Sequence, residues 1–145
     1  MQRYQQGFYY AKQNFSEWQK PASENQYYHL VSHSMGTAFG EGILKHLNAQ
    51  GYGIGHVIHI NAFQASKITV ATDSRITTID YQLLDDPLIN NFFLRILGIA
   101  APGSIHNADH QMYEHSGIGN IFKIHRSPIW KQGKGFWKNL DQKGL

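Results

Sequence analysis

The chain contains no cysteine, which excludes disulfide bonds and thiolate metal sites. Charge is also sparse, since 13 Lys and Arg residues against 10 Asp and Glu residues give a formal net charge of only +3. Nucleic-acid binding calls for a broader basic surface, so we expect no nucleic-acid partner. Much of the positive charge lies near the C-terminus, which we interpret as a solvated helix face formed by Lys131, Lys134, Lys138 and Lys143.

Long apolar runs are missing as well. No stretch reaches the roughly 18 residues of a membrane-spanning helix, so we expect no transmembrane segment. The polar first residues are unlike a signal peptide, and the sequence leaves the cellular compartment open. We expect no cofactor. A length of 145 residues suffices for one domain.

The most informative segment that is present reads VSHSMG over residues 31–36. Residues 27–31 predict a short buried strand, and residues 37–47 predict a helix with apolar side chains at helical spacing. Ser34 would therefore occupy a sharp turn between a strand and a helix. A serine presented in this way is typical of an acyl-transfer nucleophile.

A nucleophile on such a turn takes a strained backbone conformation, so the residues two positions before and after it must be small. Ser32 and Gly36 satisfy that requirement, and Gly40 would allow the helix to pack closely against the sheet. The N–H group of Met35, at the start of the helix, would point toward an oxyanion formed beside Ser34.

At these residues the sequence resembles the α/β-hydrolase superfamily, in whose lipases and esterases the nucleophile often stands in His-Ser-Met-Gly. Ser32 replaces the first glycine of the usual Gly-x-Ser-x-Gly, a mild departure because serine is also small. The resemblance implies a serine hydrolase that acts on small-molecule or lipid carboxylic esters through a Ser-His-Asp triad. It covers residues 5–145 and corresponds to the C-terminal half of the hydrolase fold.

The superfamily places four strands before the nucleophile strand, but only 26 residues precede Tyr27 here. We predict that these residues form one amphipathic helix with Phe8, Tyr9, Phe15 and Trp18 buried. The expected fold class is α/β: residues 1–145 form one partial α/β-hydrolase domain, a mostly parallel sheet flanked by helices, that lacks the N-terminal strands. We find no equivalent of the early loop that supplies the second oxyanion donor in the superfamily.

Strands and helices are expected to alternate from Tyr27 onward, which favours a parallel sheet covered by helices. Further strands are predicted at 56–60, 76–81 and 120–124, with a possible short segment at 68–71. Further helices are predicted at 88–99, opened by Pro87, and at 128–140. Residues 103–120 are predicted to form a polar loop.

A serine nucleophile requires a histidine base and an acid that orients it. In the superfamily the acid follows the second strand after the nucleophile strand, and Asp86 occupies that place, with Asp85 as second choice. The segment Asp-Asp-Pro-Leu resembles the acid-bearing turn of many lipases. Alternatively, both aspartates cap the helix opened by Pro87. Asp73 and Asp80 are weaker candidates for the acid.

The base should stand at the C-terminal edge of the last strand and ahead of the last helix. His125 fits this position best if residues 120–124 form that strand. His115, followed by Ser-Gly-Ile, resembles a base-carrying segment of some bacterial lipases, and His110 lies at a usual separation from Asp86. All three remain open, with His106 a weaker candidate. We interpret His33, His56 and His59 as structural.

Two alternatives use the same residues differently. His106, Asp109, His110 and His115 lie within ten residues and offer zinc ligands, but their spacing matches no zinc signature, so no metal site is expected. The second alternative is a hydrolase-like fragment, catalytically incomplete without a missing N-terminal half. An exposed sheet edge would then favour self-association or pairing with a partner chain.

Overall fold

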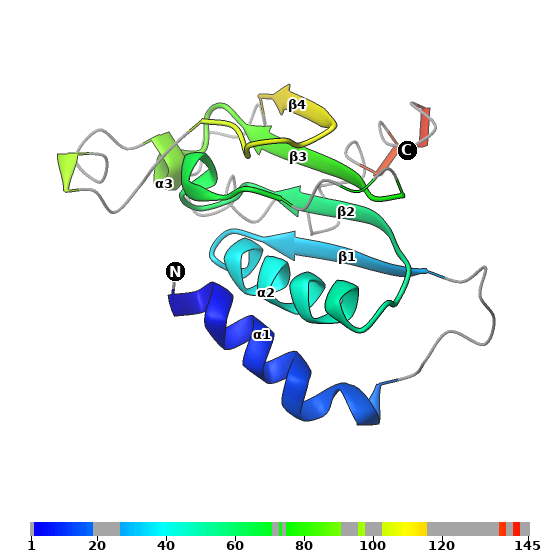
Figure 1. Cartoon of the computed structure of the whole chain (residues 1–145). Helices are drawn as coiled ribbons and strands as arrows, with labels where there is room; N and C mark the ends of the chain where they lie inside the picture. Colours follow the sequence, from blue (N-terminus) through cyan, green and yellow to red (C-terminus); the bar gives the residue numbers. More distant parts are fainter. Residues whose placement is uncertain are drawn as a thin grey trace.

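A computed structural model describes residues 2–18, 27–70, 73, 75–90, 96–97, 103–115, 137–138 and 141–142. Its main element is a four-stranded sheet in the order β1-β2-β3-β4, accompanied by helices (Figure 1). The elements are α1 (Gln2–Asn14), the short 3₁₀ helix η1 (Phe15–Glu17), β1 (Tyr28–His33), α2 (Gly36–Ala49), β2 (Ile54–Ile60), the 3₁₀ helix η2 (Ala65–Lys67), β3 (Thr77–Leu83), α3 (Pro87–Asn90) and β4 (His110–Glu114).

All three strand pairings are parallel, so the carboxyl ends of the four strands share one edge of the sheet. The first turn of α2 lies at that edge, and so does α3 (Figure 1). The predicted parallel sheet with accompanying helices is therefore confirmed at this level. β1 and β4 are the outer strands of the described sheet.

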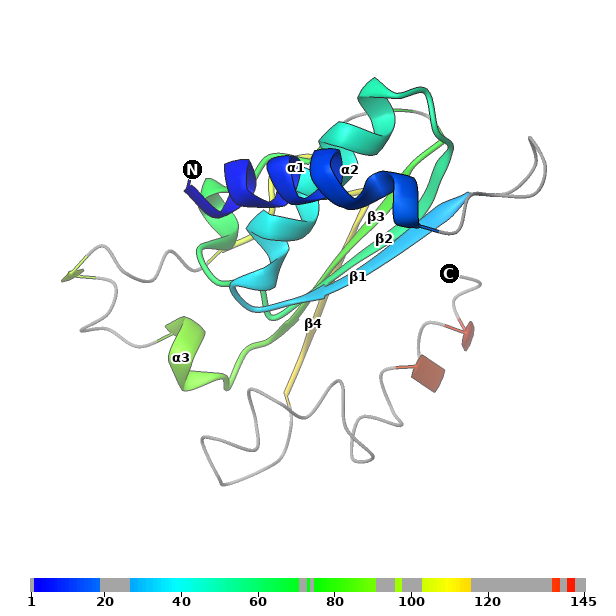
Figure 2. The ribbon, with the colours of Figure 1, turned by 90° about the horizontal axis from the view of Figure 1, so that it is seen from below.

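Helices α1 and α2 lie on the same face of the sheet (Figure 2). The core beneath them joins α2 to β1 and β2 through apolar side chains that include Leu44, Leu47, Ile54 and Val57. The opposite face of the sheet carries its own cluster, because side chains alternate between faces along each strand. That second cluster contains Ile58, Ile60, Ile79, Tyr81, Leu83 and Met112.

The first helix differs from its prediction in length and in its buried face. It ends at Asn14, well short of residue 26, and Tyr9 is 57% exposed. Phe15 is buried as expected, but α1 itself buries Gly7 and Ala11. The prediction for Tyr9 was wrong because the contact with α2 depends on small side chains, which let two helix backbones approach closely.

The prediction of an unbroken polar loop over 103–120 was also wrong. β4 lies within it and pairs in parallel with β3, with Tyr81 opposite Met112. Met112 is the only residue of β4 that is buried, so the strand lacks a clear apolar alternation. Backbone pairing to β3 stabilises it instead. The predicted strand at 120–124 lies outside the described residues, as does most of the helix predicted at 128–140.

Candidate functional site

Ser34 lies on the turn between β1 and α2, as the sequence predicts. Its backbone φ is 55°, in the left-handed region that non-glycine residues rarely adopt. Such strain persists only where neighbouring contacts hold it, and it occurs often at functional sites. The turn therefore has a strained backbone at Ser34, and we call residues 32–36, which include this turn between β1 and α2, the elbow.

Among the described residues, three backbone hydrogen bonds hold Ser34 in this conformation. Its N–H donates to the carbonyl of Ile60 at the end of β2, at 3.0 Å. Its own carbonyl accepts from the N–H groups of Thr37 and Phe63, each at 3.2 Å. Because these partners come from β2, α2 and the loop after β2, the position of Ser34 depends on three separate parts of the chain.

The glycines beside the turn play different roles from each other. A Cβ at Gly40 would meet the side chain of Leu30 at 2.8 Å, so Gly40 does allow α2 to lie close to β1. A Cβ at Gly36 would meet no atom within 4 Å. The expectation that residue 36 must be small is wrong here, because Gly36 is the first residue of α2 and is exposed to solvent.

Relief of the backbone strain should be measurable without any assay of activity. We expect Ser34→Gly to raise the free energy of unfolding by about 1 kcal/mol over Ser34→Ala, because glycine adopts positive φ without steric cost. Urea denaturation of the two variants measures the difference. An equal or lower stability for Ser34→Gly would show that the turn is unstrained.

Asp86 is fully buried beyond the end of β3. Its Oδ1 accepts from the N–H of Leu88 at 3.0 Å, which is a capping contact at the start of α3. Its Oδ2 accepts from the side-chain amide of Asn61 at 3.1 Å. Asp86 thus caps α3 and is also fixed at the same sheet edge as Ser34. Asp85 is half-buried.

The two weaker aspartates have partners of their own. Asp73 pairs with Arg75, and the hydrogen bonds from that residue lower the pKa of Asp73 to about 2. Asp80 lies inside β3, where burial raises the pKa of its carboxyl above the ordinary value. Its oxygens accept from the side chain of Gln82 and from the N–H of Ile105.

The histidine candidates separate along β4. His115 directly follows β4, at the carboxyl edge of the sheet where Ser34 follows β1 and Asp86 follows β3. His110 opens β4 and lies at the opposite end of that strand. Both are exposed, as is His106. His125 lies outside the described residues.

The fold does not bring the four candidate zinc ligands, His106, Asp109, His110 and His115, together in a metal site. Within the described part of the chain, no group of three His, Cys, Asp or Glu side chains could hold a metal ion. Asp109 instead accepts a hydrogen bond from the backbone N–H of Thr78 at 2.7 Å, which helps to fix the segment before β4 to β3.

No helix in the described part of the chain is long and apolar enough to cross a membrane.

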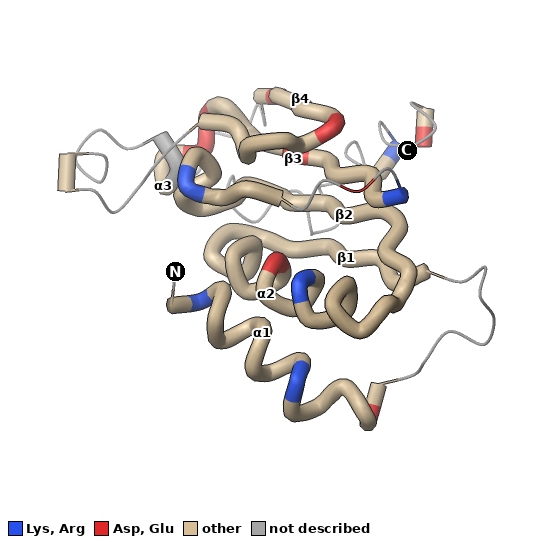
Figure 3. The backbone as a smooth tube through the Cα atoms, in the orientation of Figure 1, with Lys and Arg blue, Asp and Glu red and all other residues tan. Residues whose placement is uncertain are grey.

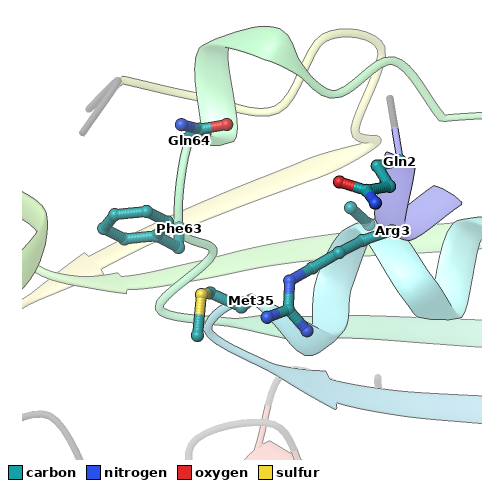
Figure 4. Close-up of a pocket in the computed structure, with 6 residues that line it drawn as sticks. Gln2, Arg3, Met35, Phe63 and Gln64 are labelled. Carbon is teal, nitrogen blue, oxygen red and sulfur yellow. The ribbon is translucent and has the colours of Figure 1, made fainter. Parts of the chain in front are cut away.

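A small cavity lies beside the elbow. Its volume is about 220 Å³, and Gln2, Arg3, Met35, Ala38, Phe63 and Gln64 line it. Figure 4 shows Arg3 extending from α1 toward Met35, with Phe63 and Gln64 on the opposite side of the cavity from Arg3. Met35 follows Ser34 in the chain, and the N–H of Phe63 donates to the Ser34 carbonyl. Two of the residues that line the cavity are therefore direct neighbours of the candidate nucleophile.

Charged side chains are sparse on the described sheet. β1 and β2 contain no Lys, Arg, Asp or Glu, and the basic residues of α1, α2 and η2 are dispersed (Figure 3). Apart from Arg3, the cavity beside the elbow is lined by uncharged side chains. Its chemistry is therefore set mainly by apolar and amide groups.

Sequence reasoning missed two sets of contacts at the site, those of Asn61 and those of His59. Asn61 has φ 46° and is fully buried, and its side chain joins Asp86 to the backbone N–H of Leu83. His59 bridges Ser32 and Glu41 inside the core. A polar residue following an apolar strand, such as Asn61, gives a weak hint of a functional edge, but its partners cannot be read from spacing.

Comparisons with protein-family models, curated proteins and solved structures gave no match. Conclusions about function therefore depend on the geometry of this chain.

Proposed function

We propose that this protein is a serine hydrolase acting on carboxylic esters, with Ser34 as nucleophile. The observation that carries the proposal is the left-handed backbone of Ser34 between β1 and α2. This is the arrangement that exposes a nucleophile at the edge of a parallel sheet, with helical N–H groups next to it. The N–H of Met35 would stabilise the oxyanion.

We propose further that the sheet corresponds to the C-terminal half of an α/β-hydrolase fold, with β1 as the nucleophile strand. The sequential order of four parallel strands supports this, as does the place of Asp86 after β3. We propose His115 as the base, because it directly follows β4 at the end of the sheet where Ser34 follows β1 and Asp86 follows β3. His125 remains the candidate outside the described residues.

In this mechanism the Ser34 hydroxyl attacks the ester carbonyl carbon while the histidine takes its proton. The carbon–oxygen bond to the alcohol then breaks, and the histidine returns the proton to the leaving alkoxide. Water hydrolyses the acyl-enzyme by the same route. Asp86 orients the histidine. The cavity of about 220 Å³ suits a short acyl group, since sites for larger ligands commonly exceed about 300 Å³.

Covalent labelling tests the proposal directly. We expect a fluorophosphonate to add once to the folded wild-type chain, at Ser34, and Ser34→Ala to abolish the adduct. Mass spectrometry of the intact chain and of its peptides measures both. Absence of labelling in folded protein would contradict the proposal.

The same assay distinguishes the histidines. The variant that loses labelling by a factor of about 10³ identifies the base, since an activated serine depends on it. We expect that loss for His115→Ala and near wild-type labelling for His110→Ala. Loss in His125→Ala alone would transfer the role to His125.

One alternative has a specific observation in its favour. β1 is an outer strand of the described sheet, and Val31 on it is 48% exposed. An open strand edge can pair with another chain. A protein that is not labelled but associates through β1 would be an interaction module and not a hydrolase.

A further inference from the structure

A chain of side-chain hydrogen bonds lies beneath the elbow and links Thr37, Ser32, His59 and Glu41 in that order. The Ser32 hydroxyl oxygen lies 2.6 Å from Nδ1 of His59, and Nε2 of His59 lies 2.8 Å from Oε1 of Glu41. The Thr37 hydroxyl lies 3.4 Å from that of Ser32. We call these four residues the elbow network.

The elbow network is inside the core. His59 and Thr37 are fully buried, and Ser32 and Glu41 are at most 9% exposed. Both ring nitrogens of His59 are hydrogen-bonded, Nδ1 with the Ser32 hydroxyl and Nε2 with the Glu41 carboxyl group. Hydrogen bonds to a charged partner in such surroundings are strong, and leaving one partner unpaired is costly.

The positions of the four residues determine what the network can do. Ser32 lies two residues before Ser34, and Thr37 and Glu41 lie on the first two turns of α2. His59 is directly opposite Ser32 in the pairing of β1 with β2. The network therefore joins the strand before the elbow to the helix after it, through the neighbouring strand.

We propose that Ser32, His59 and Glu41 are positioning residues that hold Ser34 in its left-handed conformation. The strained φ of 55° needs contacts on both sides of the turn to persist. The network supplies them, because Thr37 also donates its N–H to the Ser34 carbonyl. This proposal rests on the proposed function only in taking Ser34 as the nucleophile.

It also explains why a serine stands at position 32. A glycine there would meet the requirement for a small residue but could not bond His59. Ser32 combines a small volume with the hydroxyl that the imidazole needs. The expected effect of losing this bond is therefore on the geometry of Ser34 as well as on stability.

The test compares rates of fluorophosphonate labelling at a temperature where every variant is folded. We expect Ser32→Ala and His59→Leu to slow labelling of Ser34 by about 10²-fold, as misplacement of a reacting group by about 1 Å does. Glu41→Leu should slow labelling to a similar extent, because it removes the partner of His59 Nε2. Glu41→Gln keeps an oxygen at that position and should restore the rate to within a few-fold of wild type. Leu47→Ala, a core truncation at the far end of α2, is the matched control for lost stability and should leave the rate unchanged.

Amide hydrogen exchange gives a second readout that needs no reactive serine. We expect the amides of Ser34 and Thr37 to exchange about tenfold faster in Ser32→Ala than in Leu47→Ala. Wild-type labelling and exchange in both Ser32→Ala and His59→Leu would overturn the positioning role while leaving the hydrolase proposal intact. Accelerated exchange in a protein whose wild type is never labelled would support the positioning role and reject the hydrolase.

Discussion

Gly42→Ala is expected to lower the free energy of unfolding by about 3 kcal/mol and the melting temperature by roughly 10 °C. A Cβ at Gly42 would collide with the backbone carbonyl oxygen of Tyr4 on α1. Backbone atoms cannot rotate away as a side chain can, so α1 must shift or detach. The gain in helix propensity from glycine to alanine, about 1 kcal/mol, is too small to offset that.

Gly36→Ala is the matched control, because it makes the same change on the same helix where no atom lies within 4 Å. We expect it to alter stability by no more than about 0.5 kcal/mol. Thermal unfolding followed by circular dichroism measures both variants. Gly7→Ala should behave as Gly42→Ala does, since its Cβ would collide with the Phe39 carbonyl. Equal melting of the Gly36 and Gly42 variants would contradict the close packing of α1 on α2.

Asn61→Ala is expected to have the second large effect, a loss of about 3 to 5 kcal/mol. The substitution removes the donor to the buried Asp86 carboxylate and the acceptor of the Leu83 N–H. A buried donor that loses its acceptor, as the Leu83 N–H does, costs about 1–3 kcal/mol. Asp86 loses one hydrogen bond but keeps the one from the Leu88 N–H. Alanine also tolerates the φ of 46° less well than asparagine.

Asn107→Ala separates the backbone contribution from the buried contacts. Asn107 has φ 64° but is exposed, so only about 1 kcal/mol should be lost there. A double variant, Asn61→Ala with Asp86→Ala, should lose less than the sum of the two single variants, because the pair is in direct contact. Denaturant unfolding measures the free energies of unfolding of the three single variants and the double variant. Additive losses in the double variant would show that Asn61 and Asp86 are not in contact.

Two sets of hydrogen bonds fix the chain at the carboxyl ends of the strands, and both include residues near the end of β2. Asn61 and Asp86 fix the ends of β2 and β3, while the elbow network fixes Ser34 to β2 and α2. His59 and Asn61 stand two residues apart on the same stretch of chain. The end of β2 thus organises both the candidate nucleophile and the candidate acid.

The sequence by itself determined the strand–turn–helix around Ser34 and the strands that became β2 and β3. These depend on local patterns: β-branched runs, helical spacing and small residues at a turn, which act within a few residues of each other. It also placed Asp86 beyond a strand end, because the β-branched run at 76–81 ends a few residues before it.

Only the tertiary structure decided the place of β4, the close approach at Gly7 and Gly42, and the partners of Asn61 and His59. Each depends on residues far apart in the chain that parallel pairing and helix crossing bring together. A strand such as β4, with one buried side chain, forms because β3 offers it backbone partners. Likewise, Ser32 reads as a small turn residue until β2 places His59 beside it.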